Sequence, residues 1–294
     1  MGIQRSGVGQ AGASADHGLW SEMDFADMGK EMRMFWRDRL LPAGLAALSL
    51  SLLSGMAPAA IYAQGAQGLN DAQIEADVHK TLDNKRFQAV AANVQNGNVT
   101  LTGTVGLYAD KEDADKRVHH VKKVKAVDNE IAIAGPTVED TALRDKLANQ
   151  LAYDRVGYGT TAFNAITIGV QNGVVALGGT VYGPADKDSA LSLVENTPGV
   201  KDVVDSLEVA PVSPMDDRLR LELARVIYGT PQLQKYALDP AKPIRITVVN
   251  GNVTLSGVVD NKMDHDVAGL RANGVPGVFK VVNDLQVAGP QTGK

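Results

Sequence analysis

The residues best suited to chemistry form one basic segment in the first half of the chain. Residues 116–125 have the sequence KRVHHVKKVK. Five permanent cations lie in this segment: Lys116, Arg117, Lys122, Lys123 and Lys125. A lysine or arginine near an anionic surface contributes about 1 kcal/mol to binding. We therefore predict that these five residues are candidate contacts for the phosphate groups of anionic phospholipid.

A second explanation of the same charges is structural. Acidic residues precede the basic segment, at Asp110, Glu112, Asp113 and Asp115. A helix that begins with acids and ends with bases matches the helix macrodipole, which stabilises each such charge by about 0.3–1 kcal/mol. The sequence alone leaves both explanations open.

Catalytic and metal-binding patterns are missing from the sequence. The chain has no cysteine, which excludes disulfides, thiolate catalysis and cysteine metal ligands. His119 and His120 are neighbours, and neighbouring positions on a helix point about 100° apart, so they cannot easily share a metal ion. No Ser-His-Asp, HExxH, Walker or Rossmann pattern occurs. We expect no catalytic residue, no bound metal, no cofactor and no enzymatic activity.

The overall charge limits the range of partners. The chain has 29 basic and 34 acidic side chains and a formal net charge of −5. Five of the basic and six of the acidic side chains lie in residues 1–63, so the remainder is also net negative. Such a chain has no general attraction to nucleic acid. We expect no nucleic-acid partner, and any attraction to anionic lipid must be local.

A phrase that occurs three times shows which elements could position the basic segment. It is VQNGNVTLTGTV at 94–105, VQNGVVALGGTV at 170–181 and VVNGNVTLSGVV at 248–259. An Asn-Gly pair between β-branched runs predicts a hairpin, because its type I′ turn needs positive φ at both central residues. The predicted turn residues are Asn96, Gly97, Asn172, Gly173, Asn250 and Gly251.

A further glycine follows each predicted turn within the second strand of the hairpin. These glycines are Gly103, Gly179 and Gly257. Glycine inside a strand usually marks a bulge, a bend or the close approach of another backbone. We therefore assign these glycines and the turn residues a structural role rather than a ligand-binding one.

The repeat extends on both sides of each hairpin. Apolar residues four positions apart precede the hairpins and predict amphipathic helices; they are Ile74, Val78 and Leu82, then Leu143, Leu147 and Leu151, then Leu219, Leu223 and Ile227. A second helix is expected after each hairpin, with aligned alanines at Ala114, Ala190 and Ala268, followed by a closing strand. The predicted fold class is α+β: three tandem two-layer modules, each αββαβ with a three-stranded sheet and two helices.

The predicted modules span residues 70–135, 139–210 and 215–288. Proline-containing linkers separate them and end in acidic residues, so Asp140 and either Asp216 or Asp217 are the predicted helix N-caps. Each module is near the lower size limit for a stable core, yet each carries its own apolar face. We therefore expect three independently folded units.

The first loop of the third module differs from its counterparts. It contains three prolines and two tyrosines, Tyr228 and Tyr236. Aromatic residues above a small core most often pack at its edge, but loops also carry binding surfaces. Both interpretations are kept, with an apolar membrane contact at this loop as the alternative to the basic segment.

These motifs together resemble the BON domain, the bacterial OsmY and nodulation domain. The resemblance rests on the N-G-x-V-x-L-x-G-x-V hairpin, the covering helix and the closing strands PGVKDVVDSLEV at 198–209 and PGVFKVVNDLQV at 276–287. The first module departs from it, because KKVKAVDNEIAI at 122–133 lacks the Pro-Gly. The overall plan is similar to that of osmotically inducible periplasmic proteins. The resemblance implies a non-catalytic envelope protein whose modules contact phospholipid or other envelope components.

The amino terminus has the pattern of an export signal. Residues 32–63 run from an arginine-rich start through an apolar stretch to small residues, as in a secretory signal peptide, with cleavage expected near Ala63. Residues 1–31 are polar and unpatterned, so we expect them to be disordered or to precede a misassigned start. The expected location is the periplasm, with peripheral rather than integral membrane contact.

Two functions remain open from the sequence. The first is binding of anionic phospholipid surfaces by the tandem modules, in osmotic-stress protection. The second is a soluble periplasmic protein-binding or chaperone-like factor, because an open sheet edge can pair with a strand of another protein.

Overall fold

The structure is a computed structural model in which residues 58–289 are described, with side-chain environments described from Asn70 onward. The N-terminal segment 1–31 and residues 32–57 of the expected signal peptide lie outside the described residues. Ala63, where cleavage is expected, lies within α2 (Pro58–Thr81). Within residues 58–289 no helix is both long enough and apolar enough to cross a membrane.

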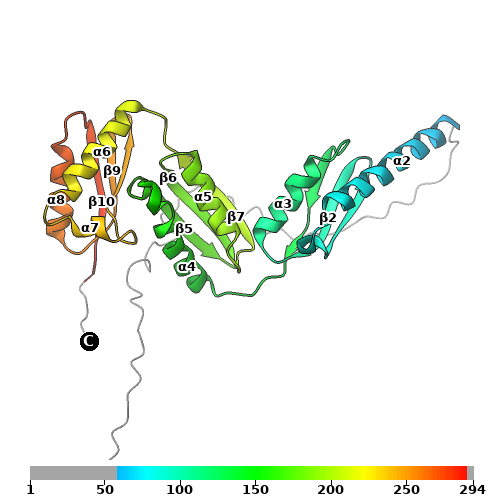
Figure 1. Ribbon diagram of the computed structural model, residues 1–294, viewed down its shortest axis with the longest axis horizontal. Helices are drawn as coiled ribbons and strands as arrows, with labels where there is room; N and C mark the ends of the chain where they lie inside the picture. The colour runs from blue at the N-terminus through cyan, green and yellow to red at the C-terminus, as the bar shows by residue number, and fades with distance from the viewer. Residues whose placement is uncertain (1–57, 290–294) are drawn as a thin grey trace, which may run out of the picture. The chain divides into compact units, whose positions relative to one another are not determined.

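Three modules of one kind follow each other along the described chain (Figure 1). The first consists of α2, η1 (Lys85–Phe87), β1 (Val90–Gln95), β2 (Asn98–Val105), α3 (Tyr108–His119), β3 (Ala126–Asn129) and β4 (Ala132–Ile133). The second consists of α4 (Asp140–Tyr153), η2 (Val156–Tyr158), η3 (Thr161–Phe163), β5 (Ala165–Gln171), β6 (Val174–Val181), α5 (Pro184–Glu195) and β7 (Asp202–Val209). The third consists of α6 (Pro214–Tyr228), α7 (Lys235–Leu238), β8 (Arg245–Val249), β9 (Asn252–Val259), α8 (Lys262–Asn273) and β10 (Lys280–Val287).

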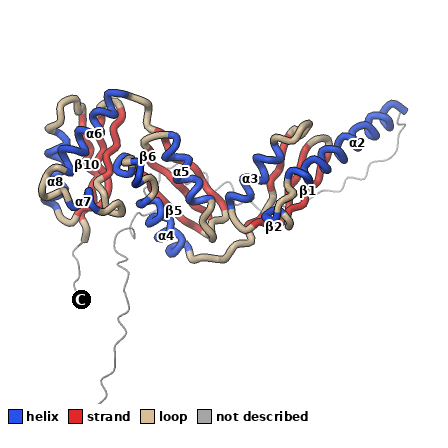
Figure 2. Tube along the Cα trace, in the orientation of Figure 1, coloured by secondary structure: helices blue, strands red, loops and turns tan. Residues whose placement is uncertain are grey.

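Each module therefore has the two layers that the sequence predicts, with helices packed on one small sheet (Figure 2). The predicted fold class, three tandem α+β modules, is confirmed.

Each sheet is built around the second strand of its hairpin. The central strands β2, β6 and β9 pair antiparallel with the first hairpin strand and parallel with the closing strand. A parallel pair requires a crossover connection, which α3, α5 and α8 supply. One detail differs from the expected single closing strand. In the first module the closing strand is divided into β3 and β4, and the Glu130 N–H in the break still donates to Leu101 O at 2.8 Å.

The apolar stripes of the sequence form the cores. The stripes of the first helices lie buried against the hairpin strands, and so do the aligned alanines Ala114, Ala190 and Ala268. Alanine suits these positions because the second helix lies close to the sheet and leaves little room for a longer side chain. Each module has one buried cluster, formed mostly by its own residues.

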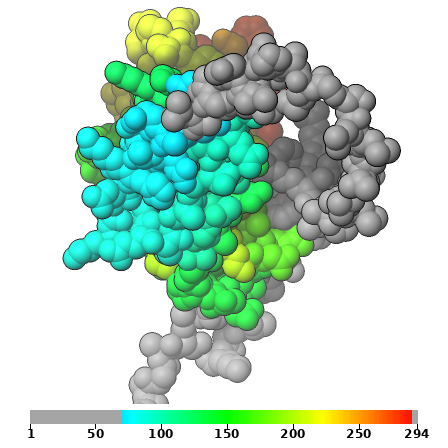
Figure 3. All heavy atoms as spheres, turned by 90° about the vertical axis from the view of Figure 1, so that its right-hand side faces the viewer, coloured from blue at the N-terminus to red at the C-terminus, as the bar shows by residue number. Residues whose placement is uncertain are grey.

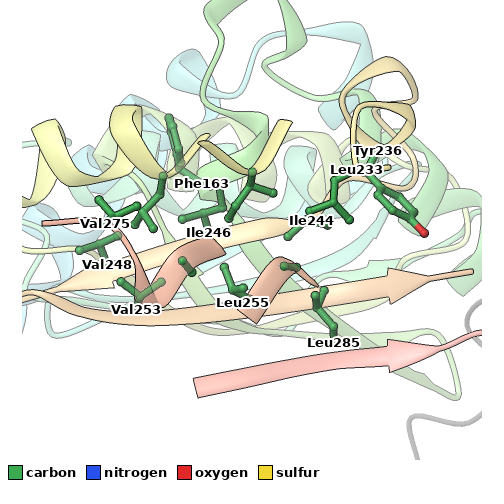
Figure 4. Packing of buried hydrophobic residues seen from close by; sticks show 14 of the residues in the cluster. Phe163, Leu233, Tyr236, Ile244, Ile246, Val248, Val253, Leu255, Val275 and Leu285 are labelled. Atoms are coloured by element: carbon green, nitrogen blue, oxygen red, sulfur yellow. The ribbon is translucent and has the colours of Figure 1, made fainter. Parts of the chain in front are cut away.

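Two buried residues correct the expectation of fully independent units. Tyr108, at the start of α3 in the first module, belongs to the buried cluster of the second module. Phe163, in the first loop of the second module, belongs to the buried cluster of the third module, beside Ile244 and Ile246 (Figure 4). Arg245 also donates a hydrogen bond to the Thr161 carbonyl. A small core gains apolar burial from such a neighbour. The third module thus completes its core with a side chain from outside its own predicted span.

Candidate functional site

The Asn-Gly turns have the backbone conformation that a type I′ hairpin requires. In the first module φ is 55° at Asn96 and 82° at Gly97, and the other two Asn-Gly pairs have the same signs. Each pair joins antiparallel strands, with Gln95 opposite Asn98 in the first hairpin. The turn therefore fixes the register of the central strand in every module.

The second glycine of each phrase marks a close approach of two backbones. At Gly103 φ is 106°, and a Cβ atom built there would lie 1.9 Å from the carbonyl oxygen of Ala89. Gly179 and Gly257 have the same sign of φ, with a Cβ at 2.1 and 2.7 Å from a carbonyl oxygen. A residue with a Cβ atom does not fit such a position without a shift of the backbone.

An aspartate from the first helix of each module binds the turn. Asp71 accepts hydrogen bonds from the N–H groups of Asn96 and Gly97, at 2.8 and 2.9 Å. Asp140 does the same for the turn of the second module at 2.6 and 2.9 Å, and Asp216 for that of the third at 2.9 and 2.9 Å. We call this contact the turn clamp. A carboxylate that accepts two backbone N–H groups makes strong, charge-assisted hydrogen bonds.

The turn clamp corrects the prediction that these aspartates are helix N-caps. Glu139 is the N-cap of α4, and Ser213 is the N-cap of α6, where its hydroxyl accepts from the Asp216 N–H at 3.1 Å. Asp140 and Asp216 lie inside the helices and point to the turn instead. Two backbone N–H groups of the turn have no partner in the strands, whereas water can reach the N–H groups at the helix N-terminus. The carboxylate therefore stabilises the turn more than it would stabilise the helix end.

The loop before the closing strand lies against the same turn. Lys125 N–H donates to Gly97 O at 2.8 Å, and its counterparts Lys201 and Phe279 make the same bond to Gly173 O and Gly251 O at 2.9 and 2.8 Å. We call this region of a module, formed by the Asn-Gly turn, the start of the first helix and the loop before the closing strand, its turn end.

The turn end of the first module borders a small cavity that is open to solvent. Its volume is about 210 Å³, and it is lined by Asn70, Asp71, Ile74, Asn96, Gly97, Lys123 and Lys125. Lys123 Nζ donates to Asn70 Oδ1 at 3.0 Å, and Lys125 Nζ donates to Asn96 O at 2.8 Å. Both ammonium groups thus bind oxygen atoms of other residues that line the cavity. The atoms of the first module, in cyan, face the viewer in Figure 3.

The charges of this cavity favour an anion. Asp71 is the acidic residue of its lining, and both carboxylate oxygens already accept backbone N–H groups. Lys123 and Lys125 contribute two cations, and Lys122 is exposed in the same loop. Ammonium groups have three donors each, so bonds to Asn70 and Asn96 leave further donors for phosphate oxygens. The arrangement offers charged N–H donors of the kind that phosphate oxygens accept.

Two of the five predicted cations lie elsewhere. Arg117, in the last turn of α3, donates to Asp113 at 2.9 Å. Lys116 is exposed on the same helix, and its charge acts on Glu195, whose pKa is raised by burial and lowered in part by Lys116. Neither residue lines the cavity. The structure therefore brings together Lys123 and Lys125, with Lys122 beside them, and separates them from Lys116 and Arg117.

Sequence reasoning missed a second repeated contact, at the start of the second helix. An acid at the third residue of this helix pairs with a base from the first loop in every module. The pairs are Arg86–Asp110 at 3.1 Å, Arg155–Asp186 at 3.4 Å and Lys235–Asp264 at 2.8 Å. The acids are 76 and 78 residues apart, as the turns are, so the repeat register is the signal that could have found them.

The third of these pairs is part of a buried network. Asp264 is only 3% exposed and accepts hydrogen bonds from Tyr236 Oη at 2.6 Å and Asn261 Nδ2 at 3.1 Å. Burial opposes ionisation of Asp264, but the bonds from Lys235 and Tyr236 outweigh it and lower its pKa. Burial and the bond to Asp264 raise the pKa of Tyr236 to about 12. The network holds the first loop of the third module onto its core.

This network also decides between the two interpretations of the tyrosine loop. Tyr236 is buried, and Tyr228 donates from its hydroxyl to Ile244 O at 2.6 Å. Both rings pack against the core of the third module. The interpretation as packing residues is confirmed, and the loop between them offers neither ring to a membrane.

Groups of three or more histidines, cysteines, aspartates or glutamates that could hold a metal ion do not occur among residues 58–289. The acids of the turn clamp are engaged with backbone amides, and those of the second helix with a base.

Comparisons with known proteins agree with the modular structure. A family model described as BON domain matches three segments, 70–135, 139–211 and 231–289. Osmotically-inducible protein Y of Escherichia coli (strain K12) is 24% identical over 189 residues, which are 64% of this chain and 92% of that protein. An uncharacterized protein in the gshII 5′ region of Anaplasma centrale is 27% identical over 139 residues, 46% of this chain and 92% of that protein.

A solved structure of CdsD, a structural protein of the type III secretion system of Chlamydia trachomatis, is 16% identical. The similarity covers 73% of this chain and 92% of that chain, with a TM-score of 0.21. The family model, in contrast, matches segments in all three modules and more than half of the chain. The protein is therefore a member of the BON-domain family, with three BON domains in tandem.

Proposed function

We propose that the protein is a non-catalytic component of the cell envelope that binds anionic phospholipid surfaces through the turn end of its first module. Lys122, Lys123 and Lys125 are the proposed contacts for lipid phosphates. Lys116 and Arg117 are outside the cavity and have a secondary role at most. Binding is peripheral, because the proposed contacts are side chains at the end of a folded module.

The observation that carries this proposal is the cavity beneath two lysines. Its lining includes one carboxylate that already accepts two backbone N–H groups of the turn, and two lysines. Each exposed lysine near an anionic bilayer contributes about 1 kcal/mol. Three such lysines in one loop provide a local attraction that the net negative charge of the chain does not.

The proposed location and role rest on two further observations. Residues 32–63 have the pattern of a secretory signal peptide, which directs the protein to the periplasm. The relative from Escherichia coli is named osmotically-inducible. We therefore place the protein in the periplasm and assign it a role in protection of the envelope under osmotic stress.

Charge reversal at the turn end tests the proposal. In the variant Lys122→Glu/Lys123→Glu/Lys125→Glu, co-sedimentation with phosphatidylglycerol vesicles should fall by about a hundredfold or more, since about 1 kcal/mol is lost per lysine and repulsion is added. Higher salt should weaken wild-type binding, because exposed charges are screened beyond about 8–10 Å. Circular dichroism checks that the fold is kept.

A matched control makes the same charge change elsewhere. Lys80, Lys85 and Lys242 are exposed and lie outside the turn ends. Lys80→Glu/Lys85→Glu/Lys242→Glu should bind vesicles nearly as well as the wild type. Equal losses in both triple variants would show that only net charge matters, and wild-type protein that ignores phosphatidylglycerol in low salt would refute the proposal.

The second candidate function is binding of other envelope proteins through a sheet edge. The closing strands β7 and β10 are edge strands, each paired with one other strand of its sheet. The backbone groups on their outer side are therefore available to a strand from another protein. Vesicle binding that is absent in the wild type, together with capture of an extended peptide, would favour this function.

A further inference from the structure

The turn end of the third module has a different chemical character from that of the first. The position of Lys125 and Lys201 is occupied by Phe279, which makes the same backbone bond to its turn. Lysine stems lie over the turn glycine in the first two modules, and Phe279 Cβ lies over Gly251 in the third. One scaffold therefore presents lysine twice and phenylalanine once.

This phenylalanine has the most exposed ring of its module, and a second exposed apolar side chain belongs to the same turn end. Phe279 is 89% exposed, and Met215 at the start of α6 is 63% exposed. Met215 precedes Asp216, whose carboxylate binds Gly251 N, while Phe279 N–H binds Gly251 O. Both residues thus belong to segments that bind the same clamped turn. Pro276, in the loop before β10, is exposed as well.

The charges around these apolar side chains are basic. Lys280 follows Phe279 and Arg218 follows the clamp in α6, and both are exposed. The acids nearby are engaged, because Asp216 binds the turn and Asp217 accepts from Arg220 at 2.6 Å. An apolar tip with a cationic rim is complementary to a bilayer with anionic head groups, where the rim meets phosphates and the tip meets acyl chains.

We propose that the turn end of the third module inserts Phe279 and Met215 into the interfacial region of a lipid bilayer. This inference rests on the proposed function, which it extends from an ionic contact in the first module to an apolar contact in the third. The partner of this surface is the lipid bilayer, at the boundary between its head groups and its acyl chains.

A bilayer fits this surface better than a protein partner does. Phe279 is almost fully exposed, and a bilayer can accept an exposed side chain without a preformed pocket. A specific protein interface buries about 800 Å² on each partner, which two or three side chains do not provide. The clamped turn also holds the backbone of Phe279 in place, so insertion orders little additional chain.

A tryptophan in place of Phe279 reports insertion directly. The two natural tryptophans, Trp20 and Trp36, lie outside the described residues. For this experiment both are changed to phenylalanine in the full chain. Phe279→Trp in that background should show a blue-shifted, stronger emission with phosphatidylglycerol vesicles. Lipids brominated on the acyl chain should quench it. The matched probe is Leu270→Trp on α8, at a residue that is 73% exposed, and its emission should not change.

Removal of the ring gives the second measurement. Phe279→Ser should lower the vesicle partition coefficient by about tenfold, the loss expected for a phenylalanine that is about half buried on binding. The loss should persist in high salt, unlike that of the lysine variant. Leu270→Ser, at another exposed apolar site on the same module, should bind like the wild type.

The outcomes separate this inference from the proposed function. If the Phe279→Trp variant binds vesicles but its indole emission is not quenched, the inference is overturned and the lysine site stays in place. Quenching of that indole on neutral phosphatidylcholine, without dependence on the lysines, would support the inference and overturn the ionic proposal. Absence of quenching on both kinds of vesicle would overturn the inference and direct attention to a protein partner for Phe279.

Discussion

Lys123 has the same left-handed backbone conformation as Gly199, its counterpart in the second module. The φ angle is 71° at Lys123 and 102° at Gly199. The glycine is free of strain in this conformation, whereas a lysine is destabilised by about 1 kcal/mol in it. The departure of the first module from the Pro-Gly pattern therefore has a local cost, and the lysine that causes it lines the proposed anion cavity.

Lys123→Gly should separate stability from binding. The first module should become more stable by about 0.5 kcal/mol, because relief of the left-handed strain exceeds the added entropy of the unfolded chain. Binding to phosphatidylglycerol vesicles should fall by about fivefold, the effect of one surface charge. Amide hydrogen exchange of β2 and vesicle co-sedimentation measure the two effects.

Lys122→Gly is the control for this prediction. Lys122 does not have positive φ, so glycine there relieves no strain and should not stabilise the module. It removes the same charge from the same loop. If Lys122→Gly stabilised the module as much as Lys123→Gly, the strain at Lys123 would not be the cause.

Loss of the turn clamp should weaken each module locally. Asp71→Asn replaces one of two carboxylate acceptors with an amide donor that faces a backbone N–H, so the free energy of unfolding should fall by about 2 kcal/mol. Exchange of the β2 amides should accelerate, while that of the β9 amides in the third module stays unchanged. Asp83→Asn, at an exposed acid outside the clamp, is the control and should change little.

Gly97→Val should disrupt the first hairpin. Valine is forced to positive φ at a position with φ of 82°, and a Cβ there would lie 3.2 Å from Lys123 O. The expected loss of stability is about 1–3 kcal/mol. Calorimetry should show the first module unfolding at lower temperature, with the transitions of the later modules retained; one shared transition at a lower temperature would contradict module-local folding.

The third module should lose stability in acid through Asp264. Its pKa is lowered in the folded state, so its contribution is present above the unfolded value of about 3.9 and is lost as pH falls through the folded value. The difference in unfolding free energy between wild type and Asp264→Asn should be largest near neutral pH and shrink below about pH 4. A difference that stays constant with pH would refute the assignment.

Much of the fold follows from local signals in the sequence. The Asn-Gly pairs, the stripe that begins at Ile74 and the aligned alanine Ala114 each obey a rule of turn geometry or helix periodicity. The repeat presents the same pattern three times, which establishes the order of elements. These signals are local, so they predict modules well.

Contacts between distant residues were not predictable in the same way. An acid at the start of a helix is typical of an N-cap, and only the folded structure shows that Asp140 turns to the hairpin instead. The five cations of residues 116–125 looked like one patch because they are close together in the sequence. The helix end divides them, since Arg117 points to Asp113 and Lys123 lies past the last turn.

The turn clamp has a consequence for how such a chain can diversify. The backbone donors of each turn are satisfied by an aspartate, and the residue at the position of Lys125 and Phe279 donates its backbone N–H to the turn in every module. Every residue except proline has that N–H, so the position of Lys125 and Phe279 tolerates substitution without loss of the hairpin. The clamped turn then stays the same while the side chain at this position changes. Exchange of Lys125 and Phe279 should graft one surface chemistry onto the other module, and tandem duplication would let each copy specialise.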